Sequence, residues 1–486
     1  MNKGYVYLVG AGPGDIRLMT IKGQQCLEKA DVVLYDRLVN PLLLEQTKPD
    51  IELVYCGKLP DRHILRQEAI QELLVDYAKK GKIVVRLKGG DPSVYGRVGE
   101  EAAALEAAGI RYEIIPGITA GIGASTYAGV PVTHREYGAS FAIVTGHDQS
   151  KNGQPQIDWK ALATGIDTIA FYMGVKNLPY ICEQLTINGR NPSTPVMLVQ
   201  WGTLGKQRVL TGTLETIVNK VLVEKFTNPA ITLVGDVTKL RTKESWFELQ
   251  PLFSKHILFA RTSSSKSKIA NQLRDNGADV FEFPRMKMND YTNEPPFPYE
   301  QYEQIIFHSE ESVDWFFRDL QRKHLDIRSI NASFYGASTK SQLRIQSYAC
   351  LSYSLNQLQK DGKRLVIGPE SIIKNVLTRQ ERYGEHDCLI SHALTVIHQS
   401  NGTCRRLLEE DRIDTIIFPS AESVRVVTEQ MADHDQTPLT LSNRAEIICF
   451  GPESERVAEQ LGYRIDHRLE KPTFEALLHV LQKKRR

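Results

Sequence analysis

The sequence is poor in the features that mark secreted, metal-binding or nucleic-acid-binding proteins. Its seven cysteines are odd in number and scattered, with no Cys-x-x-Cys pair and no histidine spacing that suits zinc, so we expect reduced thiols and no metal. The 60 basic and 58 acidic side chains nearly cancel, whereas phosphate-tracking proteins carry a basic excess. No apolar run is long enough to span a bilayer, and no signal peptide precedes Tyr5. These absences predict a cytoplasmic protein with a small-molecule ligand and no nucleic-acid or membrane partner.

The chain does have length and a high hydrophobic content. Its 486 residues are 41% hydrophobic, which is enough for two to four domains with cores of their own. Apolar runs alternate with helical stretches, which predicts an α/β fold. A short joint near residue 250 separates two halves, each with its own core. We expect α/β domains over 1–115 and 116–248, then a two-lobed parallel α/β module over 255–486, with lobe one at 255–288 plus 400–486 and lobe two at 290–392.

The first apolar run, residues 5–9, leads into a glycine-rich turn at 10–15. The turn looks like a dinucleotide fingerprint, but Asp15 stands where the third glycine belongs, and Pro13 lacks a backbone N–H that a pyrophosphate needs. A P-loop is also excluded here, because Gly57-Lys58 is followed by Leu59. We therefore set aside a NAD-linked dehydrogenase and expect a ligand that approaches the backbone closely without being necessarily phosphorylated.

Residues 86–97 form the stretch around which the first half is organised. The apolar run 83–87 predicts a buried strand, so Gly89 and Gly90 fall at its carboxyl end, where open α/β sheets bind ligands. Asp91 offers acceptors to an amine or a ribose hydroxyl, and Arg97 places a positive fork before the next helix. A plain strand-to-helix connection would also explain the two glycines.

Two more predicted strands end in charged residues. Asp36 and Arg37 follow one of them, and Lys58 follows another. Taken singly, such residues usually cap helices or pair on the surface. Three successive strand ends with glycine-rich or charged turns favour a functional site.

Several motifs in the first half occur together in the order of one known family. They lie at 9–15, 31–39, 86–92, 116–120, 172–174 and 234–236. Together they resemble uroporphyrinogen-III C-methyltransferase, which has the tetrapyrrole methylase fold and uses S-adenosylmethionine, over residues 3 to 248. The resemblance implies a homodimer through this half. It places the cofactor against Pro13, Gly89, Gly90, Asp91, Val94, Thr119, Ala120, Met173 and Gly202.

The same resemblance implies roles for the charged residues. Asp36 is the implied proton acceptor and Lys58 the implied proton donor, because a methylated pyrrole ring must lose a proton. Arg37, Arg86 and Arg97 are candidates for bidentate binding of substrate carboxylates, and Arg97 is counted with the catalytic residues. The methyl donor is already activated, so the protein's main contribution is orientation and exclusion of water.

The second half contains an internal repeat. Residues 305–313 recur as 416–424, and further strand-turn pairs match in the same register, which predicts two related lobes. Serines follow the strands and precede helices, so the turns could bind carboxylates with N–H and hydroxyl groups, although serine before a helix is ordinarily an N-cap. The candidate substrate-binding serines are Ser309, Ser338, Ser371, Ser420 and Ser454.

Segments 281–287 and 393–398 are expected to cross between the lobes. With that arrangement residues 255 to 482 resemble uroporphyrinogen-III synthase. The family often carries a tyrosine in the second crossing strand as a suspected general acid, whereas this chain has His392 or Ala393 there. The resemblance therefore leaves the general acid open.

These observations predict a bifunctional enzyme of the sirohaem or cobalamin branch. Its second half would close hydroxymethylbilane to uroporphyrinogen III, and its first half would methylate that product twice to precorrin-2. Two alternatives stay open: a methylase for another tetrapyrrole position, since the fold is shared, and a second half that binds tetrapyrrole without catalysis.

Overall fold

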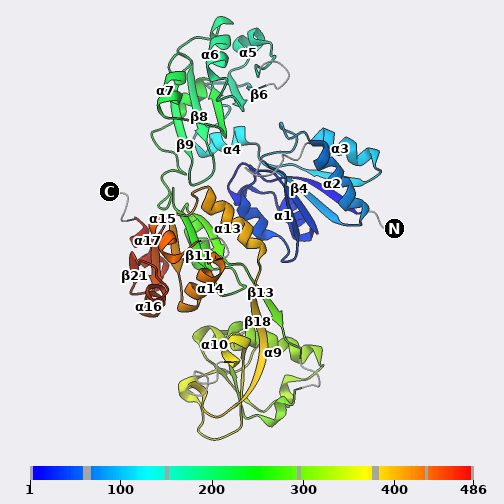
Figure 1. Cartoon of the computed structure of the whole chain (residues 1–486), viewed down its shortest axis with the longest axis vertical. Coiled ribbons are helices and arrows are strands. Elements are labelled where there is room, and N and C mark those ends of the chain that lie inside the picture. Colours follow the sequence, from blue (N-terminus) through cyan, green and yellow to red (C-terminus); the bar gives the residue numbers. More distant parts are fainter. Residues whose placement is uncertain are drawn as a thin grey trace. The chain divides into compact units, whose positions relative to one another are not determined.

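The structure, a computed structural model, describes residues 4–57, 67–147, 153–292, 297–374, 382–432 and 436–482. The chain forms two compact units. The first comprises Met1–Ala260, Ser267–Phe283 and Gln399–Arg486, and the second comprises Arg261–Lys266 and Pro284–His398. Each contains α/β sheets, as expected (Figure 1). No helix within the described ranges is both long and apolar enough to cross a membrane.

The first sheet is fully parallel, with the order β3-β2-β4-β1-β5. Its apolar strands are buried on both faces, as is typical of parallel sheets. One face packs on α1 and the 3-10 helix η2, and the other packs on α2 and α3. The strands are β1 (Tyr5–Gly10), β2 (Val32–Tyr35), β3 (Glu52–Tyr55), β4 (Ile83–Lys88) and β5 (Arg111–Ile115), and the helices are α1 (Ile21–Lys29), η2 (Pro41–Gln46), α2 (Gln67–Lys79) and α3 (Val98–Ala107).

The second sheet is mixed, with the order β6-β7-β10-β8-β9. Only β6 and β7 pair in parallel, and the other three pairings are antiparallel. The sequence predicted four strands here and missed β9, whose short stretch with two threonines and a glycine has no long apolar run. The strands are β6 (Phe141–Thr145), β7 (Thr168–Tyr172), β8 (Pro195–Gln200), β9 (Arg208–Thr213) and β10 (Ala230–Val234), and the helices are α4 (Ala120–Tyr127), α5 (Trp159–Gly165), α6 (Leu178–Ile187) and α7 (Ile217–Val223).

The third sheet is parallel, has the order β12-β11-β19-β20-β21, and belongs to the first unit. Its core includes Leu42 and, packed against it, Ile16, both from the first half of the chain. Two residues of the first half thus contribute to a core formed mainly by the second half. The strands are β11 (His256–Ala260), β12 (Asp279–Phe283), β19 (Thr415–Phe418), β20 (Glu446–Phe450) and β21 (His467–Leu469), and the helices are α8 (Lys268–Asp275), α13 (Gln399–Glu409), α14 (Ala421–Ala432), α15 (Pro438–Arg444), α16 (Pro452–Gln460) and α17 (Phe474–Gln482).

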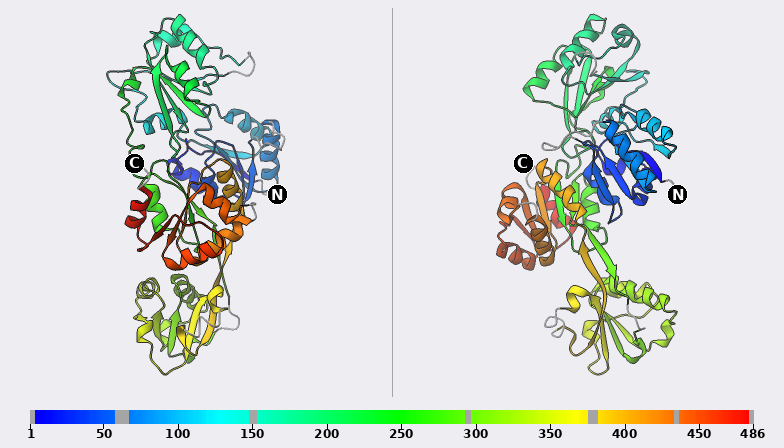
Figure 2. Two further views of the ribbon diagram at one scale, coloured as in Figure 1. Left: turned by 60° about the vertical axis from the view of Figure 1, so that its left-hand side comes forward. Right: turned by 45° about the vertical axis from the view of Figure 1, so that its right-hand side comes forward.

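The fourth sheet makes up the second unit and has the order β13-β18-β17-β14-β15-β16. It is parallel except for β13, which pairs antiparallel with β18 from Met286↔Val396 to Asp290↔His392. Residues 286–287 of the first expected crossing segment lie in β13, and residues 393–396 of the second lie in β18. The two strands run side by side in Figures 1 and 2. The strands are β13 (Met286–Asp290), β14 (Gln304–Phe307), β15 (Ser333–Gly336), β16 (Tyr353–Ser354), β17 (Arg364–Pro369) and β18 (Asp387–Val396), and the helices are α9 (Glu310–Arg322), α10 (Thr339–Gln346) and α11 (Glu370–Ile373).

The sequence repeat corresponds to a structural repeat. β14 leads into α9 and β19 leads into α14, and the serine before each helix accepts a hydrogen bond from the backbone N–H three residues on. The repeated sequence therefore specifies the same strand, cap and helix twice.

Candidate active site

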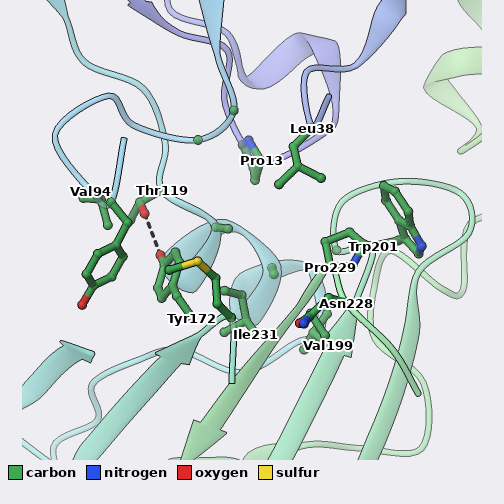
Figure 3. A pocket seen from close by; sticks show the side chains of 18 of the residues that line it. Pro13, Leu38, Val94, Thr119, Tyr172, Val199, Trp201, Asn228, Pro229 and Ile231 are labelled. Carbon is green, nitrogen blue, oxygen red and sulfur yellow. Dashed lines mark hydrogen bonds between the residues drawn. The ribbon is translucent and has the colours of Figure 1, made fainter. Parts of the chain in front are cut away.

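A cavity of about 420 Å³ lies at the carboxyl ends of β1 and β4 and extends to residues of the second sheet (Figure 3). A cavity of this volume suits a small organic ligand. All nine residues predicted to bind the cofactor line it, although they come from five separate stretches of sequence. The lining residues are Gly12, Pro13, Arg37, Leu38, Gly89, Gly90, Asp91, Val94, Tyr95, Thr119, Ala120, Ala124, Tyr172, Met173, Val199, Trp201, Gly202, Leu204, Asn228, Pro229, Ala230 and Ile231.

Two backbone turns form one wall of this cavity. Gly90 N donates to Gly12 O at 2.8 Å, and Gly12 N donates back to Gly90 O at 3.2 Å. Gly90 has a φ of +70°, which favours glycine. A Cβ added to Gly90 would make ordinary van der Waals contacts, the nearest with Ala120 N at 3.8 Å. The positive φ is therefore what favours glycine at this position of the cavity lining.

The Asp91 carboxylate completes the second turn. Its Oδ1 accepts from Ser93 N at 2.7 Å, and its Oδ2 accepts from Gly117 N at 2.9 Å. These two bonds fix the direction of the side chain. Each carboxylate oxygen has a second acceptor position, so the residue can still accept from a ligand hydroxyl or amine.

The opposite wall is aromatic and locally strained. The Tyr172 hydroxyl accepts from Gly121 N at 2.5 Å and lies 2.6 Å from Thr119 Oγ1 (Figure 3). Tyr95, Met173 and Trp201 have φ values of 55°, 55° and 50°. Such conformations are rare outside glycine and are concentrated at functional sites. Three such residues around one cavity indicate that side-chain direction here is set at a cost in backbone energy.

A buried charge cluster lies behind the end of β2. Arg86 is 2% exposed, and its Nη2 donates to Asp36 Oδ1 at 2.5 Å while its Nε donates to Glu101 Oε1 at 3.1 Å. Lys88 Nζ donates to the same Glu101 oxygen at 2.7 Å. Burial opposes the charge of Arg86, but Asp36 and Glu101 raise its pKa above the ordinary value. Burial and the neighbouring Arg86 lower the pKa of Lys88.

This cluster changes the expected role of Arg86. The sequence placed Arg86 among the groups that bind substrate carboxylates, but its buried guanidinium is already paired with two carboxylates of the chain. Removing one partner of such a buried pair is strongly destabilising. The structure therefore shows Arg86 as a residue that orients Asp36.

The other charged candidates are placed differently. Arg37 is exposed and lines the cavity. Arg97 is the N-cap residue of α3 and pairs with Glu100 through Nε at 2.8 Å and Nη2 at 2.6 Å, and its side chain is 55% exposed. Arg97 does not line the cavity. Lys58 lies outside the described residues.

In the second half, the candidate serines stand at strand ends as expected. The hydroxyls of Ser309, Ser338 and Ser420 accept from backbone N–H groups at 3.3, 3.2 and 3.2 Å, which makes them helix caps. Ser454 is 1% exposed and donates to Phe450 O at 2.9 Å. Ser371 is the second residue of α11 and is exposed. Four of the five hydroxyls are thus already bonded within their own turns.

Two histidines of the fourth sheet have hydroxyl partners. His392 is 1% exposed, and its Nδ1 lies 2.9 Å from Ser391 Oγ. His308 Nδ1 lies 2.8 Å from the Tyr383 hydroxyl, and burial lowers the pKa of His308 to about 4. His308 is therefore neutral at pH 7, and it shares this hydrogen bond with Tyr383, whose pKa is raised by burial. The sequence did not single out this pair because Tyr383 is 75 positions away along the chain.

Several cavity residues were also missed from the sequence. Tyr172 stood in a quoted motif, and Trp201 stood next to Gly202, so both had a local signal. Leu38 is next to Arg37 but is apolar and gave no signal. The segment Asn228 to Ile231 reaches the cavity only through the position of β10 in the mixed sheet.

Comparison with known proteins shows the same two-part organisation. The family model described as Tetrapyrrole (Corrin/Porphyrin) Methylases matches residues 5–218, and the model described as Uroporphyrinogen-III synthase HemD matches residues 267–479. A uroporphyrinogen-III C-methyltransferase from Priestia megaterium is 58% identical over 234 residues, which cover 48% of this chain and 98% of that protein.

A solved structure and a full-length relative complete the comparison. The uroporphyrin-III C-methyl transferase from Thermus thermophilus, described as complexed with S-adenyl homocysteine, matches with 38% identity and a TM-score of 0.43 over 49% of this chain and 100% of that one. A uroporphyrinogen-III C-methyltransferase from Bacillus subtilis (strain 168) is 43% identical over 461 residues, 93% of each protein. Because that similarity spans both halves, the chain belongs to the uroporphyrinogen-III C-methyltransferase family and carries a uroporphyrinogen-III synthase-like second half.

Proposed function

We propose that the first half transfers methyl groups from S-adenosylmethionine to two carbons of uroporphyrinogen III and so forms precorrin-2. The observation that carries the proposal is the cavity at Gly90, where all nine residues implied by the family resemblance come together. Family membership supports a tetrapyrrole methylase, and the cavity supports a ligand held closely against glycine backbone.

The residues present suit S-adenosylmethionine. Gly90 presents backbone without a side chain to the cavity, and Asp91 can accept from the hydroxyl or amine groups of the cofactor. The apolar residues Leu38, Val199 and Ile231 can pack on its adenine ring. When bound, the cofactor would supply a methyl group that is already activated. The chain's own residues then have to orient the two reactants and keep water out.

Proton transfer falls to residues at the ends of β2 and β3. Asp36, held by Arg86, is the proposed acceptor of the proton lost from the methylated ring carbon. Lys58, in the segment after β3, is the proposed proton donor. Arg37 and Arg97 are the proposed partners of substrate carboxylates, because each presents an exposed guanidinium.

The test is to incubate the full chain with S-adenosylmethionine and uroporphyrinogen III and to follow product mass. The expected product is heavier by two methyl groups. A mass gain with a different tetrapyrrole and none with uroporphyrinogen III would instead support the alternative of a methylase for another position.

We further propose that the second half closes hydroxymethylbilane to uroporphyrinogen III. The structural repeat places N-termini of helices at strand ends in both related lobes, and the match to the synthase family supports this reading. The serine caps already use the N–H groups of Ser312, Ser341 and Ser423. The other backbone N–H groups at these helix N-termini are the groups proposed to bind carboxylates.

A second half that binds tetrapyrrole without catalysis is the competing proposal. It is favoured by one observation: His392, at the position where the synthase resemblance expects a tyrosine, is buried and paired with Ser391. Feeding the full chain hydroxymethylbilane distinguishes the two. Type III isomer above the spontaneous type I product supports the synthase, and type I alone supports the binding module.

We also propose a homodimer formed through the first half, as the family resemblance implies. Light scattering of the purified full chain should then give twice the chain mass. A monomeric mass at working concentration would contradict it.

A further inference from the structure

Helix α13, from the second half of the chain, packs directly on the segment that follows β2 in the first half. Leu42 of η2 is 8% exposed and shares a core with Cys404 and Leu407 of α13. In Figures 1 and 2, α13 lies next to the first sheet. The two halves are therefore joined by packing as well as by the chain.

Polar contacts also join α13 to the first sheet. The guanidinium of Arg406 donates through Nη2 to Arg37 O, and its Nε donates to Glu410 Oε1 at 2.9 Å. The Arg406 Cζ atom also lies 6.0 Å from the centre of the Tyr55 ring, at the end of β3. One guanidinium from the second half thus contacts the ends of two neighbouring strands of the first sheet.

The carbonyl that Arg406 holds belongs to a turn of the candidate active site. Asp36 immediately precedes that residue, and Arg37 and Leu38 both line the cavity. Two backbone bonds also support the turn: Asp36 N donates to Leu87 O at 3.3 Å, and Val39 N donates to Asp36 O at 3.2 Å. The charged Arg406 donor on Arg37 O further restricts this short segment. The segment carries Asp36, the proposed base, and the cavity-lining residues Arg37 and Leu38.

The contact is also partly sealed from water. The Arg406 side chain is 18% exposed, and its Nη1 atom is buried with no hydrogen-bond partner among the described residues. Lys206 lies nearby, with its Nζ 3.4 Å from the centre of the Trp201 ring, and Trp201 lines the cavity. Electrostatic interactions of Lys206 with Arg412, Glu410, Asp279 and Arg406 extend the cluster. Charges in such a site interact more strongly than at the surface.

We propose that α13 is a positioning element of the methylase site, with Arg406 fixing the Arg37–Leu38 turn from the second half of the chain. The inference rests on the proposed methyl transfer. It assigns the synthase-like half a role in the first reaction, beyond supplying its substrate. Arg406 acts through the turn and is not itself expected to touch the reacting atoms.

The first test is kinetic and uses the full chain. Arg406→Ala should raise the KM for the tetrapyrrole by about tenfold, since a hydrogen bond from a charged donor is lost. Arg405→Ala is the matched control, because Arg405 is the adjacent arginine of α13 and is exposed. Arg406→Lys should recover part of the loss. Equal KM values for wild type, Arg406→Ala and Arg405→Ala would overturn the inference.

The second test does not depend on activity. Hydrogen–deuterium exchange in the peptide covering residues 36–43 should quicken in Arg406→Ala and stay at the wild-type rate in Arg405→Ala. Unchanged exchange in Arg406→Ala would overturn the inference. If Arg406→Ala fails to fold, Arg406→Gln takes its place in both tests.

Failure of the proposed methyl transfer and failure of the positioning role of Arg406 give different results. If the wild-type chain methylates no tetrapyrrole, the proposed function fails, and exchange still reports whether α13 holds the turn. If the wild type is active and the arginine variants match it, only the positioning role is lost. If Arg406→Ala lowers stability but leaves both KM and exchange unchanged, the contact is purely structural and the inference is wrong.

Discussion

The cavity of the first half and the serine turns of the second half occupy equivalent places, at the carboxyl ends of parallel strands, but their polar groups are used differently. At the cavity, Gly90 presents bare backbone and Arg37 is exposed. In the serine turns, four of five hydroxyls already bond within their own turn. The same position in the fold therefore leaves a guanidinium and bare backbone exposed in one region and uses the hydroxyls for helix capping in the other.

The two regions also differ in backbone strain. Tyr95, Met173 and Trp201 keep positive φ values around the cavity, whereas the helices after β14 and β15 begin with ordinary serine caps. Strain is retained where it sets the direction of side chains that face a ligand. Four variants, two in each region, test this difference.

The largest effect is expected for Asp36→Asn. An amide cannot accept the proton, so methyl transfer should fall by at least about 100-fold, while S-adenosylmethionine affinity in calorimetry stays unchanged. Asp76→Asn, an exposed aspartate on α2, should behave as wild type. A loss in Asp36→Asn below about tenfold would show that Asp36 is not the base.

Gly90→Ala tests the cavity itself. The positive φ disfavours any side chain by roughly 1–2 kcal/mol, and the added Cβ would enter the space beside the cavity, so S-adenosylmethionine affinity should weaken by about tenfold or more. Gly99→Ala is the matched control, since a Cβ there meets nothing within 4 Å. Calorimetry that finds unchanged affinity in Gly90→Ala would contradict the proposed cofactor position.

The next prediction concerns pH and His308. Its pKa is about 4 in the folded chain because of burial, below the ordinary 6.5. Between these values the unfolded chain binds a proton that the folded chain excludes, so the free energy of unfolding should fall as pH falls from 6.5 toward 4, by about 1–3 kcal/mol.

Urea unfolding of the full chain across this pH range measures the effect. His308→Gln should flatten the pH dependence. The exposed His479→Gln should leave it as in the wild type. An unchanged slope in His308→Gln would mean that other groups cause the acid sensitivity.

The smallest effect is expected for Ser309→Ala. Losing this helix cap should lower the free energy of unfolding by about 1 kcal/mol without changing the share of type III isomer formed from hydroxymethylbilane. Ser309→Asp keeps a capping oxygen and should restore stability. A drop in type III isomer with unchanged stability would instead mean that the Ser309 hydroxyl contacts substrate.

Much of the site was predictable because its residues are adjacent to strand ends. Gly89, Gly90 and Asp91 follow an apolar run, and parallel strands bring their carboxyl ends to one edge of a sheet. Arg86 could not be assigned in this way. Alternation along β4 shows which face it occupies, but its pairing with Glu101 depends on how α3 packs on the sheet.

The sequence by itself determined the α/β fold, the strand ends that carry the site, the internal repeat and the two family resemblances, because apolar periodicity and turn residues are local properties. Only the tertiary structure decided that Arg86 is buried beneath Asp36, that the serine hydroxyls are used as caps, and that α13 contacts the Arg37–Leu38 turn. These depend on pairs such as Arg406 and Arg37, separated by 369 positions. Their contact follows from the packing of whole elements and leaves no trace in local sequence spacing.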